Sequence, residues 1–113
     1  MIKNKIVLVP FPFDGFKEMK VRPVVCLTNA IGKHSHIVVA FISSKMPDEK
    51  LSSDIIILKT HNNFLKTGLN VDSVIRLHKL VTIPKELIKR ELGFADVKLE
   101  NEIAKKLNVL FSE

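Results

Sequence analysis

The sequence predicts a mainly β protein: a small barrel, or a strongly bent sheet, of short antiparallel strands with one C-terminal helix. Short apolar runs rich in β-branched residues follow one another from residue 5 to residue 81, with turn-forming residues between them. After Asp96 the pattern changes, and apolar residues recur at helical spacing. The chain has 113 residues, which suits one domain over 1–113.

Five segments have the composition of strands, and a sixth is weaker. HIVVAFIS at 36–43 is continuous and apolar, so we expect it to be buried on both faces. Turn residues such as those in FDGF and TNAIGKHS separate the segments. The other predicted strands are KIVLVPF at 5–11, PVVCL at 23–27, DIIIL at 54–58 and DSVIRLHKLV at 72–81, with RELGFA at 90–95 as the weaker, short one.

The tail reads as one amphipathic helix. Asp96 suits the N-cap of a helix that begins near Val97, because its side-chain oxygen can accept from the first free backbone N–H groups. PKELIK, at 84–89, predicts a helical turn, since proline suits the first helical position. The expected apolar face consists of Leu99, Ile103, Ala104, Leu107, Leu110 and Phe111.

Composition narrows the class of protein. The net charge of +6 favours an anionic partner such as nucleic acid or an acidic protein, and a merely solvated basic surface is the alternative. Cys26 is the only cysteine, which points to a reducing compartment, and inside VVCL it is expected to be a small buried hydrophobe. The N-terminal run is read as a strand and not a signal peptide, and no run approaches the roughly 20 apolar residues of a membrane span. We expect a cytoplasmic protein with no membrane partner.

Two places could bind phosphate. Pro23 biases Arg22 to extended geometry at the start of a strand, where a guanidinium can offer two parallel hydrogen bonds to an anion. Ser43 and Ser44 end the most apolar strand, followed by Lys45, and a serine hydroxyl can donate to a phosphate oxygen. The alternatives are a snorkelling surface arginine and hydroxyls that satisfy their own turn.

The loop FDGFKEMK interleaves aromatic and basic residues. Phe13 with Lys17 and Lys20 could hold a single nucleic-acid strand by stacking and charge, or could simply be packed and solvated. The histidine pattern H-x-H at 34–36 is weak support for a metal, and neither a hydrolase triad nor a nucleotide-binding loop is present. No cofactor and no metal are therefore predicted.

The order of these segments resembles the MazF/PemK-like family of toxin endoribonucleases over nearly the whole chain. The resemblance rests on IVLVPFPFDGFKEMKVRPVVCL, on VVAFISSK, on DSVIRLHKLVTIPKELI and on the closing helix. No single piece is specific, but their order and spacing together are. One departure is visible: where the family commonly has Gly-Asp before the first strand, this chain has Asn4-Lys5.

The resemblance implies a homodimer of SH3-like barrels that cleaves single-stranded RNA without a metal and is neutralised by an antitoxin with a disordered acidic tail. It places the catalytic arginine at Arg22 and the catalytic hydroxyl at Ser43, with Ser44 as the alternative. The remaining RNA contacts are expected at Phe13, Lys17, Lys20, Ser44 and Lys45, and His78 is a candidate auxiliary acid. The competing hypotheses are a nucleic-acid-binding module without catalysis and a protein-interaction domain of the same fold.

Overall fold

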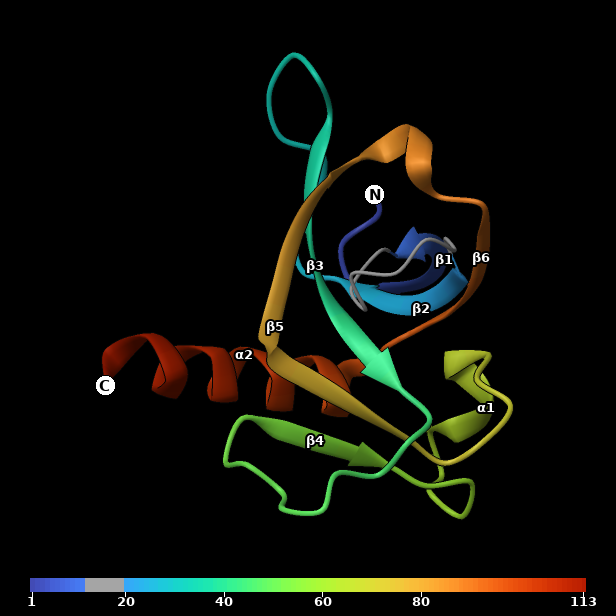
Figure 1. Ribbon diagram of the computed structural model, residues 1–113, viewed down its shortest axis with the longest axis vertical. Coiled ribbons are helices and arrows are strands. Elements are labelled where there is room, and N and C mark those ends of the chain that lie inside the picture. Colours follow the sequence, from blue (N-terminus) through green and yellow to red (C-terminus); the bar gives the residue numbers. More distant parts are fainter. Residues whose placement is uncertain (12–19) are drawn as a thin grey trace.

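The structure, a computed structural model, describes residues 1–11 and 20–113. Its main feature is one antiparallel sheet of 6 strands in the order β4-β5-β3-β2-β1-β6 (Figure 1). The strands are β1 Lys5–Phe11, β2 Lys20–Cys26, β3 His36–Ser43, β4 Asp54–Ile57, β5 Ser73–Pro84 and β6 Arg90–Phe94.

The sheet curls into a half-barrel because its longest strand bends. Ala40 of β3 faces Leu80 of β5, but the next residue, Phe41, faces Arg76, so the register shifts there. The extra residues 77–79 of β5 have no opposite number in β3, and such an irregularity bends the strand. The half-barrel is open, with β4 and β6 as its edges. The predicted mainly β class is confirmed in this form.

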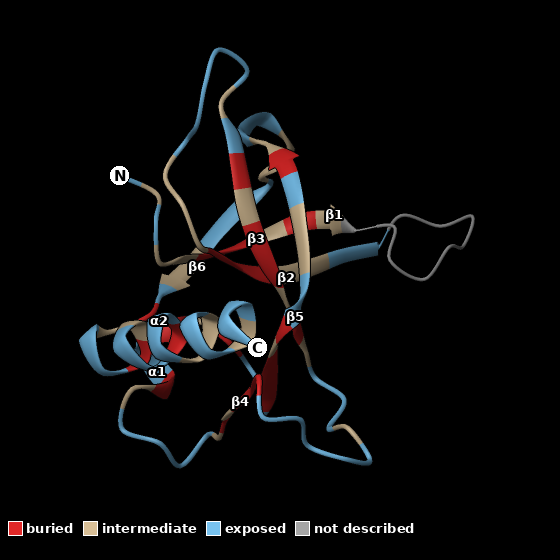
Figure 2. Ribbon diagram, turned by 90° about the vertical axis from the view of Figure 1, so that its left-hand side faces the viewer, coloured by how far each residue is buried: buried red, intermediate tan, exposed pale blue. Residues whose placement is uncertain are grey.

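The buried residues gather in the central strands and along part of α2 (Figure 2), and the apolar ones form two clusters on opposite faces of those strands. Side chains alternate between the faces with a period of two, so neighbours such as Val24 and Val25 enter different clusters. The same division separates Val39 from Ala40 in β3, which confirms that strand's predicted burial on both faces. One cluster packs under the helices and includes Ile6, Val25, Ala40, Ile42, Ile75, Leu77, Leu99 and Ile103; the other fills the curl and comprises Val7, Val9, Val24, Cys26, Ile37, Val39 and Ile83.

The C-terminal helix α2, Val97–Ser112, begins where the sequence predicts. The carboxylate of Asp96 accepts a hydrogen bond from the backbone N–H of Leu99 at 2.9 Å, which is an N-cap. The apolar face is only partly covered: Leu99 and Ile103 are buried and Leu107 packs against the core, whereas Ala104 and Phe111 are exposed. The expected place of these two on the covered face was wrong: Phe111 lies near the C-terminal end of α2, which extends past the sheet (Figure 1), and Ala104 lies beside the covered stripe, next to the buried Ile103.

Two short helices complete the fold. The sequence did not predict α1, Phe64–Thr67, which lies within a stretch read as a turn. The predicted turn at 84–89 is the 3₁₀ helix η1, Lys85–Leu87, with Pro84 just before it and not at its first position. Among the described residues, no helix is long and apolar enough to cross a membrane.

Asn4, which stands where the family commonly has glycine, preserves the turn before β1. Asn4 has a φ of 73°, a left-handed conformation that glycine adopts freely and asparagine tolerates better than most residues. Its backbone N–H donates to the carbonyl of Cys26 at 2.7 Å, and its carbonyl accepts from the N–H of Ala95 at 2.8 Å. Asparagine therefore suits the conformation that a glycine would allow.

Candidate functional site

A hollow of about 560 Å³ opens where β2 and β3 part from each other. Arg22 and Pro23 of β2 lie on one side of it, and Ser43 at the end of β3 lies on the other. The segment 68–71, between α1 and β5, contributes a further wall. Its size is in the range of pockets that take a small ligand or one unit of a polymer.

The pairing register of β2 with β3 brings Arg22 and Ser43 to the same hollow. The last pair of the β2–β3 ladder is Val24 with Phe41, and Pro23, which has no N–H to donate, is the first residue beyond it. Arg22 and Ser43 each lie two residues past that pair, on their own strands. Since side chains alternate with a period of two, they fall on the same face of the sheet.

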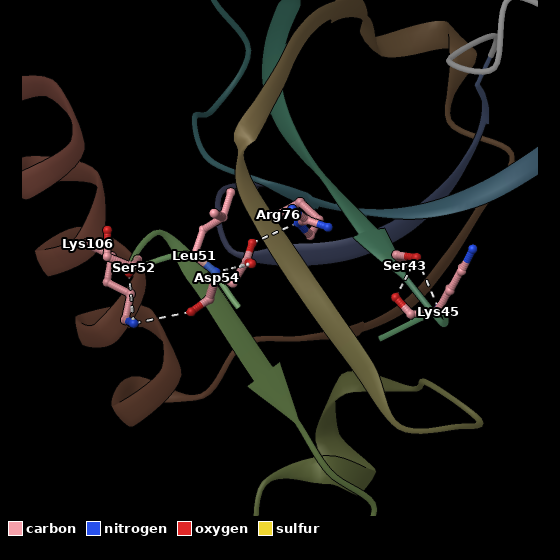
Figure 3. Close-up of polar contacts among 7 residues, drawn as sticks. All are labelled: Ser43, Lys45, Leu51, Ser52, Asp54, Arg76 and Lys106. Carbon is pink, nitrogen blue, oxygen red and sulfur yellow. Dashed lines mark hydrogen bonds and ion pairs between the residues drawn. The ribbon is translucent and has the colours of Figure 1, made fainter. Parts of the chain in front are cut away.

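Ser43 is held by a local turn with Lys45 (Figure 3). The Ser43 hydroxyl oxygen accepts from the Lys45 N–H at 3.0 Å, and the hydroxyl donates to the Lys45 carbonyl at a long 3.3 Å. The turn that the sequence offered as the alternative use of this hydroxyl is therefore present. The first bond fixes the oxygen, whereas the second is weak enough for the O–H to turn toward another acceptor.

The lining of the hollow is cationic. Arg22, Lys45 and Arg90 contribute to it, and among the described residues that line it there is no aspartate or glutamate. Clustered like charges raise the local positive potential, which favours an anionic ligand. A smaller hollow of about 370 Å³ between β4 and α2 includes Asp96 and Glu102 and therefore suits an anion less well.

Beside this site, a buried ion pair joins the edge strand β4 to β5. Nε of Arg76 lies 2.8 Å from Oδ1 of Asp54, whose side chain is fully buried (Figure 3). The N–H is not aligned with the oxygen, so the contact is an ion pair by distance and not a hydrogen bond. Oδ2 of Asp54 accepts from the N–H of Leu51 at 2.8 Å, and Lys106 of α2 donates to the carbonyl of Asp54 at 3.2 Å.

Cys26 and His78, two titratable residues that the sequence analysis considered for other roles, do not line the hollow. Burial, and secondly the charge of Glu91, raises the pKa of Cys26 to about 11, which confirms the buried thiol and disfavours a thiolate. Partial burial, with Arg76 and Lys79 nearby, lowers the pKa of His78, although Asp54 opposes this. His78 is therefore mainly neutral at pH 7, and it is not among the described residues that line the hollow.

The structure brings together four of the predicted site residues: Arg22, Ser43, Ser44 and Lys45. Lys20, the first residue of β2, is exposed and does not line the hollow. The predictions for Phe13 and Lys17 fall outside the described residues.

Sequence reasoning missed Arg90, because only the pairing of β6 with β1 carries it to this place. No group of three or more His, Cys, Asp or Glu residues that could hold a metal occurs within 1–11 and 20–113.

The fold and the hollow define a class: a small basic half-barrel with a site suited to an anion. Residues 3–111 match the family described as "PemK-like, MazF-like toxin of type II toxin-antitoxin system", and the chain belongs to this family. No curated protein matches the sequence. The predicted resemblance is thereby confirmed at the level of the family.

Solved structures with similar folds are toxins of the same kind. A Mycobacterium tuberculosis toxin, MazF-mt6, superposes with a TM-score of 0.72 at 22% identity, covering 96% of each chain. An endoribonuclease in complex with its cognate antitoxin, from a mycobacterial species, has a TM-score of 0.71 at 11% identity, over 99% of this chain and 95% of that one. The MazE–MazF structure from Deinococcus radiodurans gives 0.66 at 14%, over 98% and 94%. At these identities the likeness concerns the fold.

Proposed function

We propose that this chain is the toxin of a type II toxin–antitoxin pair and cleaves single-stranded RNA without a metal ion. The observation that carries the proposal is the meeting of Arg22 and Ser43, on one face, at a cationic hollow between two strand ends. Membership of a family of toxins supports the role, and the resemblance supplies the reaction.

The proposed reaction is transesterification within the RNA. The ribose 2′-oxygen loses its proton and attacks the adjacent phosphorus, a 2′,3′-cyclic phosphate forms, and the 5′-oxygen leaves and takes up a proton. Negative charge grows on the phosphate oxygens in the transition state. A fixed guanidinium such as that of Arg22 stabilises this charge more than it stabilises the ground state, which is the requirement for catalysis.

Arg22 is assigned the electrostatic role first. A guanidinium stays protonated in proteins, so it is a poor general base, and proton donation to the leaving oxygen is at most its second role. Ser43 would add a directed hydrogen bond by turning its O–H from the Lys45 carbonyl to a phosphate oxygen, while the Lys45 N–H continues to hold the hydroxyl oxygen. Ser44 is the alternative hydroxyl, since it lines the same hollow.

The partners follow from the same proposal. Ser44 and Lys45, Phe13 and Lys17 of the first loop, and Lys20 at the start of β2 are proposed to contact the RNA strand. An acidic antitoxin would neutralise this basic surface, and two of the solved neighbours are toxin–antitoxin complexes. A homodimer in the cytoplasm is the expected working form.

The decisive experiment is cleavage of an RNA oligomer by the purified protein in EDTA, with Arg22→Ala and Arg22→Lys measured beside it. The wild type should cut. Both variants should lose about a hundredfold to a thousandfold in single-turnover rate, because lysine keeps the charge but loses the two-pronged donor. Melting curves should change little, since Arg22 is only partly buried.

Each alternative has its own outcome. RNA binding without cleavage would support a non-catalytic nucleic-acid-binding module, and neither binding nor cleavage would support a protein-interaction domain. Cleavage that needs an added divalent ion would overturn the metal-free mechanism. Normal cleavage by Arg22→Ala would show that Arg22 is an ordinary surface arginine.

A further inference from the structure

We propose that Arg90 is a second phosphate-contacting residue of this site and grips the RNA backbone beside the phosphate that Arg22 holds. The inference rests on the proposed function and extends it to a residue far from Arg22 in the sequence. Arg90 is the first residue of β6, it is exposed, and it lines the same hollow as Arg22, Ser43 and Lys45.

Strand pairing fixes where Arg90 lies. Arg90 faces Leu8 of β1, and Leu8 faces Pro23 of β2, so the three form one row across the sheet. The backbone N–H of Lys89 donates to the Leu8 carbonyl at 2.8 Å and anchors the start of β6. Two strand spacings, about 9.5 Å, therefore separate the backbones of Arg90 and Pro23. Arg22, the residue before Pro23, leaves the sheet on the opposite face, so the two arginines are brought together only at the hollow, which opens beyond the end of the β2–β3 ladder and which both of them line.

Two glycines, Gly68 and Gly93, let the backbone of β6 lie directly against the end of α1 at the other wall of the hollow. A Cβ on Gly93 would lie 2.2 Å from the carbonyl oxygen of Lys66, and one on Gly68 would lie 2.0 Å from that of Leu92. Gly68 also has a φ of 73°, which favours glycine. The backbones of β6 and of the end of α1 thus touch directly, so the strand that carries Arg90 has a fixed position beside the segment 68–71.

The charges around Arg90 leave it available for an anion. Its neighbour Glu91 pairs with Lys5, Nζ to Oε1, at 2.7 Å. Within 1–11 and 20–113, the side chain of Arg90 itself has no ion pair and no hydrogen bond. Phosphate oxygens accept the paired donors of a guanidinium, so Arg90 can hold an anion that enters the hollow.

The test is the affinity for an RNA oligomer with 2′-O-methyl groups, which lacks the attacking hydroxyl and so cannot be cut. We expect Arg90→Gln to raise Kd about tenfold, as for the loss of one charged hydrogen-bond contact. The slope of log K against log salt should become less negative by about 0.7, one phosphate contact on a single strand. Arg90→Lys should keep most of the slope, because it keeps the charge.

Lys89→Gln is the matched control: it removes the same charge from the next residue, which does not line the hollow. It should leave Kd and slope close to wild type, and all variants should melt alike. Equal effects of Arg90→Gln and Lys89→Gln, or none from either, would overturn the role of Arg90. Failure of the proposed function is a separate result: a wild type that binds the oligomer but cuts no unmodified RNA loses the catalytic role and keeps the Arg90 contact. A wild type that neither binds nor cuts overturns both.

Discussion

The Ser43 hydroxyl has one donor and two acceptor positions, and its turn with Lys45 uses them unequally. We expect Ser43→Ala to slow single-turnover cleavage about tenfold, the equivalent of about 1.4 kcal/mol, because a neutral hydroxyl makes a weaker bond than a guanidinium. Ser43→Thr keeps the hydroxyl and should cleave at close to the wild-type rate.

Ser44→Ala is the control, since it removes the neighbouring hydroxyl and leaves the turn at Ser43 in place. A rate loss confined to Ser43→Ala would support the assignment of Ser43. A larger loss in Ser44→Ala would transfer the catalytic role to Ser44, and equal rates in all four proteins would remove both hydroxyls from the mechanism.

Single residues of the candidate site were predictable where a local rule marks them. Arg22 precedes a proline, and Ser43 ends an apolar run, so both were visible in the sequence. Arg90 follows LIK and precedes ELGF without any such mark, and only the β6–β1 pairing brings it to Leu8. The pairing of Asp54 with Arg76 is likewise a product of the β4–β5 register, because the two residues face each other there.

Among the elements, α2 offers the most direct test of local stability. Asp96 caps it, and the hydrogen bond from Leu99, with that of Asn63 and the charges of Lys66 and Lys98, lowers the pKa of this carboxyl despite some burial. Its folded pKa is thus below the unfolded value, near 3.9. The ionised cap therefore stabilises the fold above about pH 4, and the contribution is lost as pH falls through the folded pKa.

We expect Asp96→Ala to lower the free energy of unfolding by about 1 kcal/mol at pH 7. Asp96→Asn should stay within a few tenths of the wild type there, because asparagine is an equally good cap. Urea unfolding at pH 7 and pH 3 measures both. Between these pH values the wild type should lose more stability than Asp96→Asn; an identical pH dependence would show that the carboxylate contributes no charge-dependent stability.

Helices and strands were predicted correctly where an apolar pattern extended over several residues. The strand at 36–43 and the start of α2 were predicted at their observed positions. The helix α1 was missed because its single turn, in the polar stretch 61–68, has no apolar repeat, and tertiary contacts with β6 hold it. The exposed Phe111 shows the converse: helical spacing predicts an apolar face but not whether the sheet is wide enough to cover it.

For the whole molecule, the net charge of +6 left open whether the basic surface binds an anion or is merely solvated. The fold favours the first, because it gathers Arg22, Lys45 and Arg90 around one hollow without an acidic residue among its described lining. Charge alone could not have predicted this gathering, since the three residues come from different strands and loops. Charge that is concentrated along a groove also steers an anionic strand toward it.

Salt dependence of RNA binding tests the charge distribution, and Lys20 is the residue to change. Lys20 lies two residues before Arg22 on β2, on the same face and about 6.6 Å along the strand, so RNA that passes Arg22 can pass Lys20. We expect Lys20→Gln to make the slope of log K against log salt less negative by about 0.7.

Lys33→Gln removes the same charge from the loop before the start of β3, at the end of that strand away from Ser43 (Figure 1). It should leave the slope unchanged. The slope is measured with an uncleavable RNA between about 50 and 200 mM salt. If both variants flatten it equally, the RNA responds to net charge and not to position; if only Lys33→Gln does, the RNA runs across the other end of the half-barrel and the path past Arg22 is wrong.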